Sequence, residues 1–191
     1  MASLHIILSS MYGGKTNSLL REVSSDAAMG LQCLYVNHSL DTRSTTIFST
    51  HNKLLKVEGE IENIKFVKTD RLSTVEVAGF DVVAIDEAQF YEDLYECVCK
   101  FVDVDRKKVL VAGLDGNSNR QKFGQILDLI PMSDTVVKLL PYCKRCADAE
   151  PKRLVKAPFT HRFVKSADVI LVGGSEYYQP VCRSCYLELN S

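Results

Sequence analysis

The residues with the clearest chemical role lie near the start of the chain, at positions 9–16. This segment follows the apolar run 4–8 and precedes residues 17–29, whose apolar positions recur at helical spacing. A strand, a loop ending in Gly-Lys-Thr and a helix indicate a phosphate-binding loop, although Ser9 replaces its usual first glycine. Backbone N–H groups bind phosphate oxygens there, while Lys15 neutralises charge and the Thr16 hydroxyl holds Mg²⁺. The phosphate loop comprises Ser9, Ser10, Met11, Tyr12, Gly13, Gly14, Lys15 and Thr16.

Two adjacent carboxylates, Asp86 and Glu87, end the apolar run 80–85. Carboxylates at the C-terminal end of a parallel strand face the ligand side of an α/β sheet. Asp86 is the candidate for holding Mg²⁺, and Glu87 is the candidate general base that accepts a proton from an attacking hydroxyl. Taken alone, the pair fits solvated acids that end a strand equally well. The phosphate loop upstream favours a nucleotide site.

Four of the seven cysteines form two closely spaced pairs, Cys143 with Cys146 and Cys182 with Cys185. Each pair can present two thiolates from one tight turn, and two such turns complete a tetrahedral Zn²⁺ site. Because four thiolates leave no open coordination position, we predict a structural zinc that anchors residues 147–181 at both ends. Four free buried thiols are the less favoured alternative. The odd cysteine count agrees with metal ligation and argues against a disulfide framework.

Further along the chain, β-like apolar runs alternate with helical patterns up to about residue 140, which predicts an α/β fold with a mostly parallel sheet and helices on both faces. We expect strands at 4–8, 31–36, 64–67, 80–85 and 108–112, and helices at 17–29, 91–101 and 123–130, the last one stopped by Pro131. Two domains are expected: a nucleotide-binding domain at 1–140 and a small metal-centred domain at 141–191.

Composition sets limits on function. A net charge of -1 gives no overall electrostatic footprint for nucleic acid or an anionic membrane. No apolar run approaches the length of a membrane span, and residues 1–3 lead into a predicted strand without the features of a signal peptide. The sequence therefore predicts an intracellular protein with no membrane partner and no direct nucleic-acid binding.

The order of the motifs resembles the type II thymidine kinases of animals, bacteria and large DNA viruses, over nearly the whole chain. The matching segments are MYGGKT at 11–16, DTR at 41–43, IDEAQF at 85–90, LDG at 114–116, LIP at 129–131, VVKL at 136–139, VGG at 172–174 and YQPVCRSCY at 178–186. Only the cysteine quartet is specific by itself.

This resemblance implies a RecA-like P-loop domain and a zinc-ribbon-like domain that carries a lasso loop, near residues 171–178, which closes over the nucleoside. It implies transfer of the γ-phosphoryl group of ATP to the 5′-hydroxyl of thymidine, with Mg²⁺ at Thr16 and Asp86. The implied catalytic residues are Glu87, Lys15 and Arg43. The implied substrate-binding residues are Met11, Asp41, Phe90, Leu114, Arg120, Phe123, Leu171, Val172, Gly173 and Tyr178. The resemblance also implies a cytoplasmic homotetramer that thymidine triphosphate inhibits.

The chain departs from the family pattern at several positions. Ser9 replaces the first loop glycine, and Gly13 stands where many relatives carry serine. Ser118 replaces an aromatic wall residue, and Pro151 falls where a small hydroxylic residue beside the thymine methyl is expected. The segment 155–168 is longer than its counterpart in relatives.

Two other classes of protein remain open from sequence. A P-loop ATPase that remodels nucleic acid would need a basic track interleaved with aromatic residues. The two Lys-Arg pairs, at 144–145 and 152–153, make only a small basic patch. A zinc-ribbon binding protein with a decayed nucleotide site is the second alternative, and it requires that Ser9 disable the phosphate loop.

Overall fold

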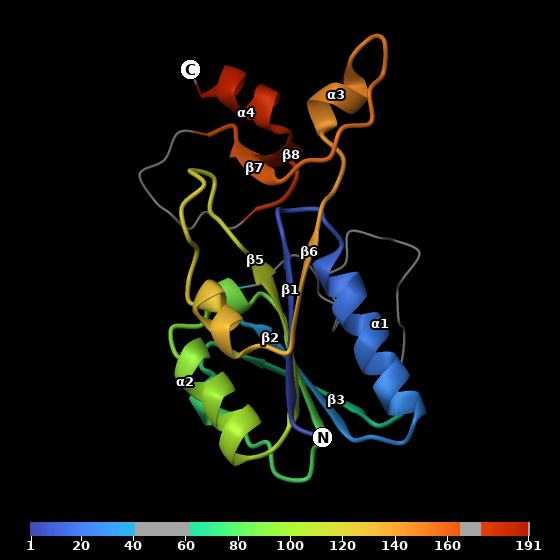
Figure 1. Cartoon of the computed structure of the whole chain (residues 1–191), viewed down its shortest axis with the longest axis vertical. Helices are drawn as coiled ribbons and strands as arrows, with labels where there is room; N and C mark the ends of the chain where they lie inside the picture. Colours follow the sequence, from blue (N-terminus) through green and yellow to red (C-terminus); the bar gives the residue numbers. More distant parts are fainter. Residues whose placement is uncertain (41–61, 165–172, 191) are drawn as a thin grey trace.

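A six-stranded parallel sheet forms the body of the molecule in the computed structural model, which describes residues 1–40, 62–164 and 173–190 (Figure 1). The strand order is β3-β2-β4-β5-β1-β6, and every pairing in it is parallel. The strands are β1 (Ser3–Ser9), β2 (Cys33–His38), β3 (Ile64–Thr69), β4 (Val82–Ile85), β5 (Lys108–Leu114) and β6 (Thr135–Leu139). The predicted α/β fold with a parallel sheet is confirmed.

Helices cover both faces of this sheet. Successive strand residues point to opposite sides, so apolar side chains on each face need a helix to pack against. In β1, Ile6 packs into the core shared with α2 (Leu94–Cys99), whereas Ile7 packs into the core shared with α1 (Lys15–Ala28). A π-helical turn, η4 (Lys100–Val104), continues α2. Two 3₁₀ turns, η2 (Leu72–Thr74) and η3 (Ala88–Phe90), complete the connections near β3 and β4.

The predicted helix at 123–130 is wrong. The chain forms a 3₁₀ helix instead, η5 (Ile126–Met132), with Pro131 inside it. Gly124 has a φ of 63°, and a Cβ at this glycine would lie 2.3 Å from the Gln89 carbonyl oxygen. A left-handed residue this close to a neighbouring backbone prevents a right-handed α-helix from starting at position 123.

Strand β6 lies at one edge of the sheet, where the sequence pattern predicts no strand. It pairs with β1, yet its residues 135–138 are exposed on both faces. The side chains of Val136 and Val137 are 41% and 51% exposed. The strand therefore presents apolar surface and an unpaired backbone edge within the described part of the chain.

A second, smaller body lies at the end of the molecule beyond the carboxyl ends of β1 and β6 (Figure 1). It contains the antiparallel pair β7 (Phe159–Arg162) and β8 (Tyr178–Val181), with the short helices α3 (Lys144–Asp148) and α4 (Arg183–Leu189). We call its described residues, 141–164 and 173–190, the cysteine module. Its core consists of the four paired cysteines together with Ala157, Val181 and Tyr186.

Among the described residues, no helix combines the length and apolar character needed to cross a bilayer.

Candidate active site

The phosphate loop connects the end of β1 to the start of α1, as predicted. Gly14 has a left-handed backbone, with a φ of 81°, and it stands at the N-terminus of α1, where no side chain caps the helix. Lys15 is only 8% exposed. A buried ammonium group needs an anionic partner, and a helix N-terminus favours negative charge. The loop therefore fits the phosphates of a nucleotide.

Asp86 follows β4 and lies against the start of α1. Its Oδ2 accepts a hydrogen bond of 2.8 Å from the Tyr35 hydroxyl, and its carboxylate is also hydrogen-bonded to the side chain of Thr16. Burial and the neighbouring Glu87 raise the pKa of Asp86 to about 6, while the bonds from Tyr35 and Thr16 oppose that rise. The two residues predicted to hold Mg²⁺ are thus in contact, and their oxygen donors suit this hard cation.

Glu87 follows directly after Asp86 and starts the turn into η3. Its backbone is left-handed, with a φ of 50°, which is uncommon for a residue other than glycine. Its Oε2 accepts a 2.7 Å hydrogen bond from Nε2 of Gln89, and Oε1 of Gln89 accepts a 2.9 Å bond from the Leu114 N–H. The candidate base is therefore buried and held by a side chain that is itself fixed to the end of β5.

The predicted nucleoside-binding residues lie in several places. The rings of Phe90 and Phe123 meet edge to face at 5.7 Å, so two of the predicted wall residues are adjacent. Tyr178 is buried at the start of β8. The guanidinium of Arg120 lies 4.4 Å from the ring centre of Tyr186, in the cysteine module. Asp41, Arg43, Leu171 and Val172 lie outside the described residues, and Gly173 begins the described segment that leads to Tyr178.

Three site residues were missed from the sequence: Tyr35, Gln89 and Thr160. Thr160 accepts a 3.0 Å hydrogen bond at Oγ1 from the Met11 N–H, so this buried hydroxyl lies beside the phosphate loop. Pro151, where a hydroxylic residue is expected from the family pattern, is exposed. Thr160 gives no signal in the sequence beyond its β-branched side chain, which is typical of any strand.

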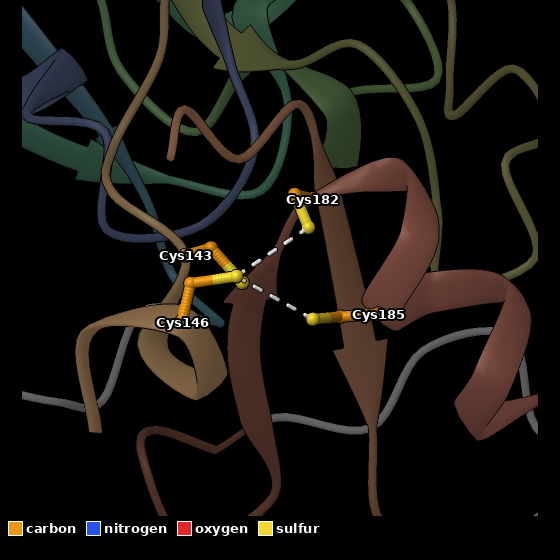
Figure 2. A group of neighbouring side chains, drawn as sticks. All are labelled: Cys143, Cys146, Cys182 and Cys185. Carbon is orange, nitrogen blue, oxygen red and sulfur yellow. Dashed lines mark hydrogen bonds between the residues drawn. The ribbon is translucent and has the colours of Figure 1, made fainter. Parts of the chain in front are cut away.

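The four paired cysteines lie together, as predicted (Figure 2). Cys143 and Cys182 precede α3 and α4, and Cys146 and Cys185 lie in those helices, so each pair spans the first turn of a short helix. All four sulfur atoms lie within 4.8 Å of one another, and all four residues are buried.

Distances between the sulfur atoms fit a metal site. Sγ of Cys146 is 3.8 Å from Sγ of Cys182 and 3.7 Å from Sγ of Cys185. Four sulfurs at the usual Zn–S length in a tetrahedron are about 3.8 Å apart, whereas a disulfide needs about 2 Å. The quartet is therefore compatible with a structural zinc ion.

Ser9 and Gly13 compensate each other within the phosphate loop. A Cβ at Gly13 would lie 1.7 Å from Oγ of Ser9, so only one of these positions has room for a side chain. We expect Gly13→Ser to weaken nucleotide binding by about 5- to 150-fold, the range that corresponds to a typical overpacking cost of 1–3 kcal/mol.

The double variant Ser9→Gly/Gly13→Ser should recover most of that loss, because it empties the space that the new serine needs. Titration of a fluorescent ATP analogue into both variants and into Ser9→Gly measures the coupling. Additive effects of the two substitutions would show that the positions are independent.

Comparison with known proteins agrees with this arrangement. The family model for thymidine kinase matches residues 2–186. The chain is 37% identical to a thymidine kinase of Oryza sativa subsp. japonica over 187 residues, which is 97% of this chain and 66% of the rice protein. It is 38% identical to thymidine kinase a of Arabidopsis thaliana, covering 97% of this chain and 75% of the relative, and 33% identical to the thymidine kinase of Vaccinia virus (strain Western Reserve), covering 97% of both. The chain belongs to the thymidine kinase family.

Proposed function

We propose that this chain is a cytoplasmic thymidine kinase, which transfers the γ-phosphoryl group of ATP to the 5′-hydroxyl of thymidine. The observation that carries the proposal is the convergence of the phosphate loop, the Thr16–Asp86 contact and the buried Glu87. Phosphoryl transfer depends on positioning and on neutralising charge, and these groups supply both.

Each residue then has a separate task. The loop amides and Lys15 bind the phosphates of ATP. Thr16 and Asp86 would hold Mg²⁺, which would supply charge neutralisation at the phosphate oxygens. Glu87 accepts the proton of the 5′-hydroxyl as that oxygen attacks the γ-phosphorus; the bond from the γ-phosphorus to the β,γ-bridging oxygen breaks and ADP leaves. Gln89 fixes the orientation of the Glu87 carboxylate. Arg43 is assigned, by family resemblance alone, to stabilise the charge on the phosphoryl group during transfer.

The proposed binding site for the nucleoside, which accepts the phosphoryl group, is supported by the paired rings of Phe90 and Phe123 and by the buried Tyr178. We propose that thymine lies among these residues and that the lasso segment ending at Tyr178 closes over it. The four cysteines of the module would hold a structural zinc, which would anchor that segment and so lower the entropy cost of ordering it on the substrate. Thymidine triphosphate, which carries both the base and the phosphates, is the expected feedback ligand.

Thermal melting with separate ligands tests this function. Thymidine and thymidine triphosphate should each raise the melting temperature of the purified chain, because they bind the folded state. Single-stranded DNA should leave it unchanged. Stabilisation by DNA alone would favour a nucleic-acid-binding ATPase and contradict the kinase.

We further propose that the chain forms a homo-oligomer through β6, with the tetramer as the expected state by resemblance. An exposed, apolar edge strand is a liability in a monomer, and a second copy would cover it. Leu140 and Tyr142 extend the apolar surface of Val136 and Val137, with 37% and 49% exposure.

Substituting Val137 with lysine should reduce the oligomer, because it places a charge at the contact. Sedimentation analysis of this variant beside Val104→Lys, an exposed valine in η4 and outside this surface, measures the effect. An unchanged mass for Val137→Lys would place the interface on another surface.

A further inference from the structure

The phosphate loop is tied to the cysteine module by two hydrogen bonds, and a third ties it to the end of β6. Oγ of Ser10 donates to the Ala157 carbonyl at 2.9 Å, and the Met11 N–H donates to Oγ1 of Thr160 at 3.0 Å. Oγ of Ser9 donates to the Leu139 carbonyl at 2.8 Å, just before the chain enters the module. Ser9, Ser10 and Thr160 are all buried, so these bonds lie away from competing water.

The partners of these bonds are connected directly to the cysteine cluster. Ala157 is fully buried in the same core as the four cysteines. Thr160 lies in β7, opposite Pro180 of β8, and β8 leads at once into Cys182. The quartet is therefore linked through the packed core and the β7–β8 pair to the groups that hold Ser10 and Met11.

These contacts also limit the shape of the loop. The Met11 N–H is directed at Thr160, so this amide is not part of the phosphate-facing set. The Ser10 hydroxyl and the Met11 N–H are held from outside, so the start of the loop is fixed before phosphate binds. Fixing a binding loop in advance lowers the entropy cost of binding its ligand.

We infer that the cysteine module positions the phosphate loop, with Ser10 and Thr160 as the positioning residues. The state of the four-cysteine site then governs the affinity for ATP as well as the binding of the nucleoside. This inference rests on the proposed function, because it takes the loop to be the ATP site. It assigns the module a role at the donor nucleotide that does not depend on the lasso.

The test compares three variants by equilibrium binding of the fluorescent analogue mant-ATP with Mg²⁺. Thr160→Val keeps the shape of the side chain but removes the acceptor for the Met11 N–H, and it should weaken mant-ATP binding by about 3- to 10-fold, the usual effect of losing one hydrogen bond. Thr160→Ser keeps the hydroxyl and should bind like the unaltered chain. Thr74→Val is the matched control, because it also removes a threonine hydroxyl; Thr74 lies in η2, and its hydroxyl donates to the carbonyl of Arg71.

A second arm repeats the titration after zinc is removed with a chelator, with hydrogen exchange of residues 9–16 as an independent readout. Zinc removal should weaken mant-ATP binding to the unaltered chain and speed exchange in the loop. Thr160→Val should add little in the zinc-free protein, because the bond that it removes is already loosened.

Equal mant-ATP affinity for Thr160→Val and the unaltered chain would overturn the inference, and so would a full additional loss in the zinc-free variant. Failure of the unaltered, zinc-loaded chain to bind mant-ATP would instead contradict the proposed kinase function, so the two failures are distinguishable.

Discussion

Replacing Glu87 with glutamine is expected to lower kcat for thymidine phosphorylation by about 100- to 10,000-fold, the contribution typical of a general base. The amide has nearly the same shape, and its oxygen can still accept the hydrogen bond from Gln89, so the fold of the site should persist. Affinity for ATP should be nearly unchanged, because Glu87 is not part of the phosphate loop. Steady-state kinetics and mant-ATP binding on the same preparation measure both quantities.

Glu92→Gln is the matched control for this experiment. Glu92 is exposed and lies five residues further along the chain, so its neutralisation should leave kcat unchanged. If Glu87→Gln retained the kcat of the unaltered chain, Glu87 would not be the base, and the attacking hydroxyl would lose its proton by another route.

Replacing Cys182, a proposed zinc ligand, with serine is expected to have the second large effect. Structural zinc sites in small modules contribute about 10–16 kcal/mol to folding, and the core of this module is little more than the quartet and its immediate neighbours. The module should lose its order while the six-stranded sheet remains folded. KM for thymidine should rise strongly, and the affinity for ATP should fall through the contacts at Ser10 and Thr160.

Limited proteolysis followed by mass spectrometry locates the effect. New cleavage sites should fall within residues 141–190, and zinc content should drop to near zero. Cys99→Ser is the control, because Cys99 lies in α2, half-buried and apart from the quartet. A proteolysis pattern that does not change in Cys182→Ser would show that the module folds without metal.

The sequence was informative where local pattern and core packing agree. Strands β1, β4 and β5 are buried apolar runs, and the helix after the phosphate loop has a clear apolar face, so their type and approximate bounds were predictable. Strand β6 was missed because its residues are exposed on both sides, which removes the burial pattern that identifies a strand. The contact between Gly124 and Gln89 is non-local, and it replaced the helix expected at 123–130.

The residues of the candidate site likewise fall into two groups, those that the sequence predicts and those that only the fold reveals. Lys15, Thr16, Asp86 and Glu87 belong to short contiguous motifs, so their roles follow from residue type and spacing. Tyr35, Gln89 and Thr160 act through contacts with residues that are distant in sequence or on other elements, and their side chains have many ordinary structural uses. Only the fold brings the Tyr35 hydroxyl to Asp86 and the Thr160 hydroxyl to Met11.

Phosphorylation of thymidine by this chain is best tested by an assay across the natural nucleosides. The purified chain would be incubated with ATP, Mg²⁺ and, in separate reactions, thymidine, deoxycytidine, deoxyadenosine and deoxyguanosine, with products separated by chromatography. We expect thymidine monophosphate as the main product and little phosphorylation of the purine nucleosides. Absence of thymidine monophosphate from the zinc-loaded protein, or a preference for a purine nucleoside, would contradict it.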